Sequence, residues 1–390
     1  MKPHLLARLG FIYAASSIAL APAHADSANH RFMNPGASWP AEPTVVAHRG
    51  ASALRPEHTL EAYRRAIIDG ADIIEPDLVL TKDGVLIARH ENEISGTTDV
   101  AAHPEFASRK VTKMIDGIPV TGWFTEDFTL AEIKTLRARE RIPANRPANT
   151  YYNGRFDVPT LQEVIDLAQE QSRMLGRVIG IYPETKHPTY FKSIGMPMER
   201  RLVEQLERNG YKGKNSPVLI QSFEVANLKE LRSMTRIRLA QLIDNPNNPP
   251  AANGIPRNKP YDFIANNDPR TYADMLTPAG LKEIAAYADV VAPYKEIIIP
   301  RDSSNNLGAP TSIVEDAHAA KLKVHTWTFR PENPFLPAAL RSANPAAPAE
   351  RGDSVAEIAA YLRAGIDGFF TDDPAIGREA VNAFAGKNKN

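Results

Sequence analysis

Short apolar, β-branched runs alternate with amphipathic stretches along the chain from Thr44 onward. A regular alternation of strand and helix favours parallel strands that are joined by crossover connections, as in α/β proteins. The predicted strands are 44–48, 72–77, 85–90, 178–184, 218–222, 238–242, 289–292, 323–328 and 365–370. The predicted helices are 59–69, 161–171, 199–209, 225–233, 278–288, 312–320 and 354–364.

The predicted strands number nine, which is one more than a (β/α)8 barrel contains. Asp83-Gly84 is a hairpin turn signal, so we expect 85–90 to return antiparallel beside 72–80. The other strands are separated by segments of crossover length. The chain is therefore predicted to form a (β/α)8 TIM barrel over residues 44–380, with a doubly wound sheet as the alternative fold.

Three segments interrupt this alternation of strands and helices. Residues 91–157 contain scattered proline, glycine and aromatic residues, and we predict that they form an insertion packed over one end of the barrel. Residues 244–272 and 329–351 are rich in proline, and we expect long loops there, which in compact domains usually serve function. Residues 381–390 are predicted to be a tail.

The first residues have the pattern of a targeting segment. Lys2 and Arg8 precede an apolar run that is too short to span a bilayer comfortably, and the small-residue pattern Ala-His-Ala follows at positions 23–25. We therefore expect an exported protein, periplasmic or secreted, with an uncleaved membrane anchor as the alternative. The predicted N-terminal layout is a signal peptide at 1–25 and an extended leader at 26–43.

The composition limits the partners and the metal ligands that the protein can have. Lysine plus arginine and aspartate plus glutamate each number 46, so the overall charge favours neither nucleic acid nor an anionic membrane as a partner. The absence of cysteine excludes disulfides, thiolate metal ligands and a cysteine nucleophile. Any metal ion must therefore be bound by carboxylates, histidines or carbonyl oxygens.

Carboxylates gather on the second and third predicted barrel strands, near the carboxyl ends where barrel active sites lie. Glu75 and Asp77 are two residues apart and share one face of a strand, and Glu184 ends the next barrel strand. Neighbouring carboxylates repel each other unless a proton or a cation lies between them. We therefore predict a site for one divalent cation, Ca²⁺ or Mg²⁺, with unrelated acids on a solvated face as the alternative.

Two histidines, His48 and His90, each follow an apolar strand. If the hairpin turns at Lys82-Asp83, His90 lies roughly opposite Asp77, and both histidines border the carboxylates. Two histidines can divide the roles of base and acid in a phosphoryl displacement. The alternative is that one or both are structural residues or metal ligands.

Further residues at the strand ends are candidates for substrate contact. Arg49 and Lys186 are suited to a phosphodiester anion, because arginine offers a bidentate fork and lysine a point charge. Glu57 is a ligand or substrate group, or it belongs to the entry of a helix that Thr59 caps. Phe223 and Trp327 are expected to form an apolar wall of the site, with core packing as the alternative.

These residues lie in segments that together resemble the glycerophosphodiester phosphodiesterase family, in its exported bacterial branch. The resemblance covers about residues 44–374 and is most specific in its first segment. The matching segments, in chain order, are AHRGASALRPEHTLEAYRRAIIDGADIIEPDLVLTKDGVLIARHE, IYPETK, LIQSF, VHTWTFR and DGFFTDDP. The chain departs from the common family pattern at Ala53-Leu54-Arg55, at Glu91 after His90, and at Gly96 before a threonine pair, which bears on substrate preference.

The resemblance implies a barrel with a family-specific insertion after the second catalytic histidine. It implies metal-dependent hydrolysis of a glycerophosphodiester, a small-molecule substrate, to sn-glycerol 3-phosphate and an alcohol. A related phospholipase that acts on intact lipid and a glycerophosphodiester-binding protein without turnover are the alternatives. The implied roles are acid–base catalysis for His48 and His90, metal binding for Glu75, Asp77 and Glu184, and phosphate binding for Arg49 and Lys186.

Overall fold

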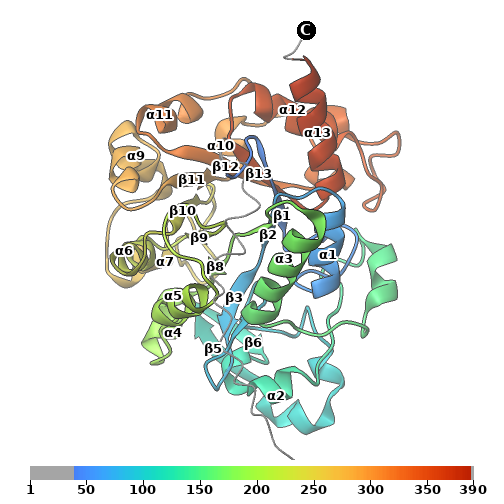
Figure 1. The fold of residues 1–390 in the computed structure, drawn as a ribbon, viewed down its shortest axis with the longest axis vertical. Coiled ribbons are helices and arrows are strands. Elements are labelled where there is room, and N and C mark those ends of the chain that lie inside the picture. The colour runs from blue at the N-terminus through green and yellow to red at the C-terminus, as the bar shows by residue number, and fades with distance from the viewer. Residues whose placement is uncertain (1–38, 388–390) are drawn as a thin grey trace, which may run out of the picture.

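Residues 39–387 are described by a computed structural model, and within them eight parallel strands close into a barrel (Figure 1). The barrel closes because β13 pairs in parallel with β1, with Val45 opposite Phe369. This confirms the predicted (β/α)8 TIM barrel and excludes the doubly wound sheet. The strands are β1 (Thr44–His48), β2 (Ile73–Glu75) continued by β3 (Asp77–Leu80), β7 (Gly180–Ile181) continued by β8 (Glu184–Thr185), β9 (Leu219–Ser222), β10 (Arg238–Ile243), β11 (Val290–Pro293), β12 (Lys323–Phe329) and β13 (Gly368–Thr371).

The second and third barrel strands are each interrupted by a proline. Pro76 separates β2 from β3, and Pro183 lies between β7 and β8. Proline has no backbone N–H to donate, so the ladder breaks at both positions and resumes one residue later. The two breaks are adjacent, because β2 pairs with β7 while β3 pairs with β8. The acidic residues Glu75, Asp77 and Glu184 all border these breaks.

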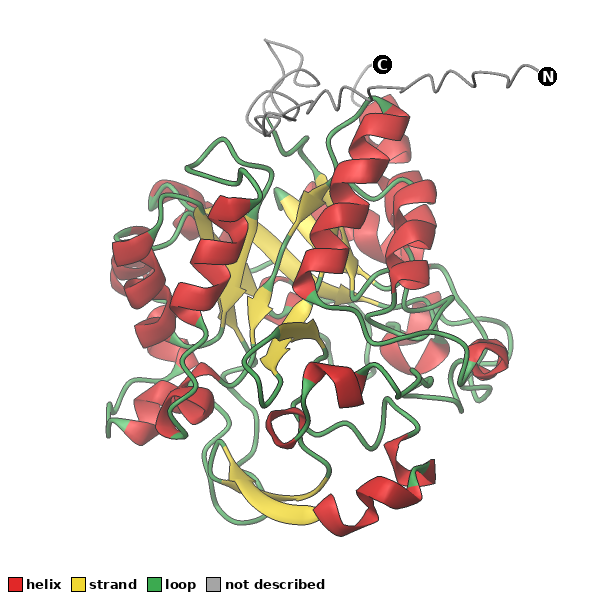
Figure 2. Cartoon of the chain, turned by 60° about the horizontal axis from the view of Figure 1, so that its bottom comes forward, coloured by secondary structure: helices red, strands yellow, loops and turns green. Residues whose placement is uncertain are grey.

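Helices cover the outside of the barrel (Figures 1 and 2). Thr59 caps the first of them as predicted, since its hydroxyl accepts from the backbone N–H of Ala62 at 3.1 Å. The helices are α1 (Leu60–Ile68), α3 (Leu161–Leu175), α4 (Pro188–Ser193), α5 (Glu199–Arg208), α6 (Val225–Met234), α7 (Tyr261–Ala265), α8 (Tyr272–Met275), α9 (Pro278–Ala285), α10 (Lys295–Ile298), α11 (Ile313–Ala319), α12 (Ser354–Arg363) and α13 (Pro374–Lys387).

The insertion after the second barrel strand begins with the predicted hairpin partner. Strand β4 (Leu86–Ala88) runs antiparallel to β3. A second hairpin, β5 (Val111–Ile115) and β6 (Ile118–Gly122), lies apart from the barrel strands together with α2 (Leu130–Ile133) (Figure 1). Short 3-10 turns occupy Val100–Ala102, Pro104–Arg109, Thr125–Asp127 and Pro147–Tyr152 here, and Asn333–Phe335 and Ala338–Leu340 farther along.

Three expectations about local structure are corrected. Residues 91–157 were not expected to contain strands, yet Asp116-Gly117 turns the β5–β6 hairpin with φ of +49° and +78°. This is the same Asp-Gly signal that predicted the first hairpin. The predicted tail 381–390 is wrong up to Lys387, because α13 continues to that residue. The predicted loop 244–272 contains α7, and α8 begins at its last residue.

The N-terminal predictions fall mostly outside the described residues, since the signal peptide 1–25 and the leader up to residue 38 are not among them. The end of the leader packs against the starts of barrel strands. Trp39 lies over Gly180, where a Cβ atom would come within 2.3 Å of the indole, and its carbonyl accepts from Arg238 at 2.9 Å. Inside the barrel it adjoins an apolar cluster of Val46, Ile73, Tyr182, Leu219, Ala240, Val290 and Phe370.

Candidate active site

The three predicted carboxylates meet at the carboxyl ends of the barrel strands. In the parallel register, His48 lies beside Glu75, Asp77 beside Glu184, and Glu184 beside Gln221. Each of the three acids offers an oxygen, and these oxygens lie within 4.8 Å of one another although all three residues are buried. The pleat and the two proline breaks therefore bring the acids into one cluster, which we call the acidic triad.

The charges of the acidic triad are unbalanced without a cation. Burial and the neighbouring Asp77 and Glu184 raise the pKa of Glu75 well above its usual range, and burial raises that of Glu184 to about 8. Burial opposes ionisation of Asp77 as well, but Lys186, His90 and His58 hold its pKa well below normal. Asp77 Oδ1 is buried and accepts no hydrogen bond from residues 39–387. A divalent cation fits this cluster, because its charge would satisfy that oxygen and remove the repulsion.

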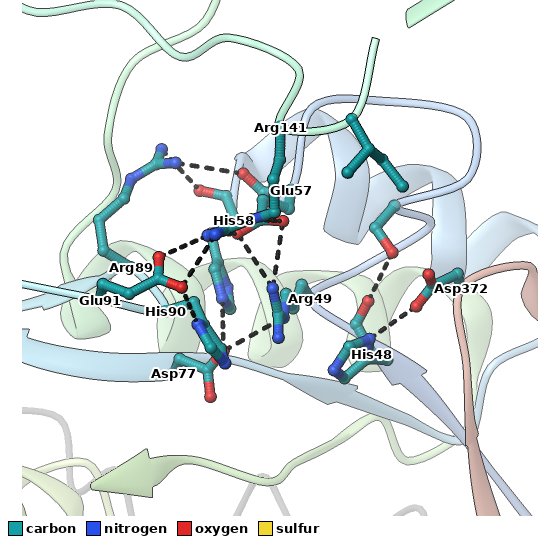
Figure 3. A network of polar contacts seen from close by, with 12 residues as sticks. His48, Arg49, Glu57, His58, Asp77, Arg89, His90, Glu91, Arg141 and Asp372 are labelled. Atoms are coloured by element: carbon teal, nitrogen blue, oxygen red, sulfur yellow. Dashed lines mark hydrogen bonds and ion pairs between the residues drawn. The ribbon is translucent and has the colours of Figure 1, made fainter. Parts of the chain in front are cut away.

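His48 lies at the end of β1 with its ring against Asp372, which follows β13 (Figure 3). Its Nδ1 is 2.6 Å from Asp372 Oδ1. Burial, with Arg49 nearby, lowers the pKa of His48 to about 4, against the opposite effect of Asp372. A neutral ring that donates from Nδ1 leaves Nε2 as an acceptor, which suits a general base.

His90 follows β4 and lies across the cavity from the first histidine. Its Nδ1 is 2.5 Å from Glu91 Oε1, and its Nε2 is 3.3 Å from the ammonium of Lys186. Burial, Arg49 and Lys186 lower the pKa of His90 to about 3. The register differs from the expectation by one residue, because the backbone N–H of Arg89, not of His90, donates to the Asp77 carbonyl at 3.0 Å.

Arg49 lies between the two histidines in a left-handed conformation, with φ of +59°. This conformation turns its backbone N–H toward Glu75 Oε2, which accepts at 2.7 Å, and places its Nε 3.4 Å from Asp77 Oδ2. Its Nη1 contacts Glu57 at 3.2 Å. The guanidinium thus lines the cavity while its carboxylate partners lie behind it.

Glu57 lies behind Arg49, and its role as a ligand or substrate group stays a prediction. Among the described residues it is absent from the cavity wall, and both of its oxygens contact arginines, Arg49 and Arg141. Burial opposes its ionisation, but the two guanidiniums hold its pKa well below the usual range. These two pairs position the Arg49 guanidinium from behind.

The remaining predicted residues line one cavity of about 50 Å³. The ammonium of Lys186 contacts Glu184 Oε1 at 2.8 Å. The rings of Phe223 and Trp327 meet edge to face with centroids 5.6 Å apart, which gives the cavity the predicted apolar wall. The cavity is lined by His48, Arg49, Glu75, His90, Glu184, Lys186, Gln221, Phe223, Leu242, Trp327, Thr328 and Phe370.

A larger cavity of about 220 Å³ adjoins the first and shares Glu184, Lys186 and Phe223 with it. Its outer wall comes from Asp116 and Ile118 of the β5–β6 hairpin and from the long loop after β10. The two cavities together form a site with a polar centre and a roomier side chamber. The other lining residues are Thr185, His187, Pro188, Ser222, Glu224, Asp244, Ile255, Pro256, Arg257, Lys259, Tyr261, Ile264 and Tyr272.

Several residues of the site were not identified from the sequence. Asp372 was visible only as part of the matching segment DGFFTDDP, although its position after the last strand places it beside the first. Glu91 was noted only as a departure from the family pattern, although it directly follows His90. Gln221 was visible only as part of the matching segment LIQSF, and its amide donates to Glu75 Oε1 at 3.0 Å. His58, whose Nε2 is 2.9 Å from Asp77 Oδ2, was visible only as part of the first matching segment.

Comparison with known proteins places this geometry in context. Residues 48–376 match the model of the glycerophosphoryl diester phosphodiesterase family. Glycerophosphodiester phosphodiesterase GDPD6 of Arabidopsis thaliana is 37% identical over 343 residues, which are 85% of this chain and 83% of the relative. A glycerophosphodiester phosphodiesterase of Haemophilus influenzae is 28% identical over 351 residues, 86% of this chain and 88% of the relative.

Solved structures share the fold. A glycerophosphodiester phosphodiesterase from Agrobacterium tumefaciens superposes with a TM-score of 0.52 at 17% identity, covering 85% of this chain and 97% of that one. An Oleispira antarctica phosphodiesterase, solved in complex with the product sn-glycerol-3-phosphate, superposes with a TM-score of 0.54 at 17% identity, covering 87% and 97%. At these identities the likeness supports the barrel alone.

Proposed function

This chain belongs to the glycerophosphoryl diester phosphodiesterase family and hydrolyses glycerophosphodiesters, and we propose that it does so in the cavity between His48 and His90 with one divalent cation. One observation carries the proposal. Two neutral histidines, each bonded at Nδ1 to a carboxylate, face a cavity that is also lined by Glu75 and Glu184 of the buried acidic triad. A protein that only binds its ligand has no need of such an acid–base pair.

The products are sn-glycerol 3-phosphate and an alcohol. Arg49 and Lys186 bind the phosphodiester anion, because both cations line the cavity between the histidines. Lys186 contacts His90 Nε2 in the free protein, so we expect it to turn to the phosphate when substrate binds. Phe223 and Trp327 pack against the apolar side of the substrate and keep water from that side of the cavity.

The positions of the histidines suggest how they divide the proton transfers. Both histidines line only the smaller cavity, but His90 contacts Lys186, which also lines the larger one. If the alcohol occupies the larger chamber, His90 is the closer ring to the leaving oxygen and donates the proton. His48 then removes the proton from the nucleophile, which is either water or a neighbouring hydroxyl of the substrate.

Glu75, Asp77 and Glu184 are the residues that would bind the cation. A bound divalent cation polarises a phosphoryl oxygen and orients substrate hydroxyls. We favour Ca²⁺ over Mg²⁺, because Ca²⁺ accepts flexible carboxylate geometry and is abundant outside the cytoplasm. The test is to titrate metal-free protein with each ion and measure turnover; equal activation by both ions would contradict the preference for Ca²⁺.

The larger chamber is the site we propose for the alcohol part of the substrate. The insertion contributes Asp116 and Ile118 to its wall, so it shapes which head groups enter. Deleting the β5–β6 hairpin (residues 111–122) and joining its ends by a short glycine linker should change relative turnover across choline, ethanolamine, glycerol and inositol esters. An unchanged profile in a folded variant would show that the insertion does not select the head group.

Export from the cytoplasm is proposed from the N-terminal segment, and membership of the exported bacterial branch is proposed from the matching segments together. Among the described residues, no helix has the length and apolar character that crossing a bilayer requires. Expression of the full chain in a bacterial host, followed by fractionation and N-terminal sequencing, tests the proposal. We expect a periplasmic protein beginning at Asp26; an uncleaved product in the cytoplasm would contradict it.

The experiment that tests the function is coupled detection of sn-glycerol 3-phosphate released from a panel of glycerophosphodiesters. We expect release that stops when a chelator is added and returns with excess cation. Release from intact phospholipid with none from the deacylated esters would identify the protein as the related phospholipase. Tight binding of the esters without release would identify a binding protein.

A further inference from the structure

Two arginines of the insertion contact the carboxylates that orient the two histidines. Arg141 pairs with Glu91, and Arg146 pairs with Asp372. Both belong to one short segment, residues 139–149, which we name the arginine bracket. The barrel supplies the catalytic rings and the arginine bracket supplies the groups behind them; Figure 3 shows Arg141 in this arrangement.

Arg141 joins two carboxylates with a complete set of contacts. Its Nη1 and Nη2 lie 2.9 Å and 2.7 Å from the two oxygens of Glu91, and its Nε and Nη2 lie 2.8 Å and 2.7 Å from those of Glu57. Glu91 is bonded to the His90 ring, while Glu57 contacts Arg49. One guanidinium therefore fixes both a histidine and a phosphate-binding arginine through their carboxylate partners.

Arg146 is the counterpart on the other side of the cavity and is almost fully buried, with a side-chain exposure of 5%. Its Nη2 contacts Asp372 Oδ2, the oxygen that does not bind His48. Its Nη1 donates to the Ser52 carbonyl at 2.8 Å, and its Nε donates to Glu332 at 2.7 Å. Each nitrogen of the guanidinium therefore has an acceptor, and contacts to Asp372, Ser52 and Glu332 fix its position.

Hydrogen bonds also fix the arginine bracket itself. Glu140 accepts from the backbone N–H of Ile142 at 2.9 Å and from the Asn149 amide at 2.8 Å. Asn149 also donates to the Ser52 carbonyl at 3.1 Å, and the Arg139 N–H donates to the Thr97 carbonyl at 2.9 Å. The segment therefore bridges the insertion and the loop after β1.

We propose that Arg141 and Arg146 are positioning residues, through which the insertion fixes the orientation and tautomer of both catalytic histidines. The inference rests on the proposed function. A carboxylate bonded to an arginine keeps one rotamer and accepts from Nδ1–H, so Nε2 of each ring faces the cavity. The insertion is then part of the catalytic machinery of the barrel as well as a wall around the substrate.

The two sides differ in their tolerance to change. The Glu91 side chain is 33% exposed, so without Arg141 it would exchange its contacts with water while the fold persists. Asp372 is only 3% exposed and would lose its partner inside the protein, although Arg330 Nε also lies 3.1 Å from it. Arg141→Gln is therefore the primary test, and Arg146→Lys, which keeps the charge without the fork, is the second.

The experiment measures kcat and KM of the cation-loaded enzyme on an alkyl glycerophosphodiester. Arg141→Gln should lower kcat about 10–100-fold, as is common when the partner of an active-site histidine is lost, and it should also raise KM, because Glu57 then fixes Arg49 less firmly. Added to His90→Ala, the same change should cause no further loss of kcat, because the ring it orients is gone, and only the rise in KM should remain. Arg146→Lys should behave in the same way toward His48→Ala.

The matched control is Arg137→Gln. Arg137 also belongs to the insertion and pairs with Asp157 at 3.1 Å, but among the described residues it contacts neither histidine carboxylate. It should leave kcat at the wild-type value, and thermal melting should show all variants folded. If Arg146→Lys does not fold, the comparison of Arg141→Gln in the wild-type and His90→Ala backgrounds tests the proposal by itself.

Two results would overturn the inference. One is a wild-type kcat in folded Arg141→Gln. The other is an equal loss of kcat from Arg141→Gln in the wild-type and His90→Ala backgrounds, which would indicate a general structural role. Failure of the proposed function is distinguishable from both, because then the wild-type enzyme itself would release no sn-glycerol 3-phosphate.

Discussion

The two ends of the barrel are built from the same strands but are filled with different chemistry. At the amino-terminal ends, Trp39 packs over Gly180 and adjoins an apolar cluster that includes Leu219 and Val290. At the carboxyl-terminal ends, buried carboxylates, histidines and arginines crowd together, and some of their atoms lack partners among residues 39–387. The amino end is thus a close-packed apolar core, whereas the carboxyl end holds a cluster of buried charged groups.

This difference teaches that stability and catalysis are separated along the barrel axis. The apolar side chains buried at the amino end stabilise the fold, because their burial removes apolar surface from water. The acidic triad disfavours the cation-free fold, because like charges share a buried site. Substitutions at the amino end should therefore lower the free energy of unfolding and leave the rate unchanged. Substitutions at the carboxyl end should mainly lower the rate.

The largest effect is expected from removing the cation. Chelation should abolish release of sn-glycerol 3-phosphate, and excess Ca²⁺ should restore it, because the role proposed for the acidic triad is to bind a divalent cation. Circular dichroism should show the barrel intact in the chelated protein, since the amino end does not depend on the ion. Full turnover in metal-free enzyme would remove the metal assignment.

Loss of either histidine should be the next largest effect. His48→Ala and His90→Ala should each lower kcat by about 10²–10⁴, the usual range for general acid–base catalysis, and leave cation affinity nearly unchanged. An aryl ester with a nitrophenol leaving group should partly rescue the loss of the proton donor, since this group departs without a proton. Rescue of His90→Ala but not His48→Ala would fit the proposed order, and the reverse pattern would exchange the two roles.

The matching variant at the amino end is Leu219→Ala. Leu219 is 1% exposed inside the apolar cluster, so its truncation should lower the free energy of unfolding by about 2–5 kcal/mol and leave kcat unchanged. Urea unfolding and steady-state kinetics check the two quantities. A loss of rate comparable to that of the histidine variants would show that the two ends are not separate.

The smallest effect concerns acid stability. The folded-state pKa of Glu57 lies below its ordinary value of 4.5, since Arg141 and Arg49 outweigh the opposing effect of burial. Its stabilising contribution is therefore complete above that value and is lost as the pH falls through the folded pKa. Arg141→Gln should lower the free energy of unfolding by on the order of 1.5–3 kcal/mol at neutral pH, and this difference should shrink in acid.

The control for acid stability is again Leu219→Ala, which removes no titratable group. Its difference from wild type in free energy of unfolding should be the same at neutral and acidic pH. A difference for Arg141→Gln that is equally independent of pH would show that ionised Glu57 contributes nothing through this pair.

The sequence predicted the barrel, because alternating strands and helices have few stable arrangements. It also predicted the acidic triad and both histidines, since each follows a strand whose end must lie at the active face. It did not predict the partners that come from distant segments. Asp372 meets His48 across the barrel closure, and Arg141 and Arg146 arrive from an insertion without regular periodicity, so neither contact has a local pattern.

The surroundings of Glu57 were also not predicted, because two arginines enclose it and no one-dimensional spacing indicates such enclosure. The errors have physical causes as well. The β5–β6 hairpin was missed although Asp116-Gly117 has the same turn chemistry as Asp83-Gly84, because its strands are mostly exposed and lack an apolar face. Helix α13 lies after the last predicted strand, where a closing helix completes the barrel.

The most direct test of the account is product analysis of one reaction by folded, cation-loaded protein. Glycerophosphocholine is incubated with wild type, His48→Ala, His90→Ala and Leu219→Ala, and the products are identified by mass spectrometry and coupled assay. The account predicts sn-glycerol 3-phosphate and choline from wild type and Leu219→Ala, and strongly reduced release from both histidine variants. Equal release from the histidine variants, or none from wild type across the panel of head groups, would contradict it.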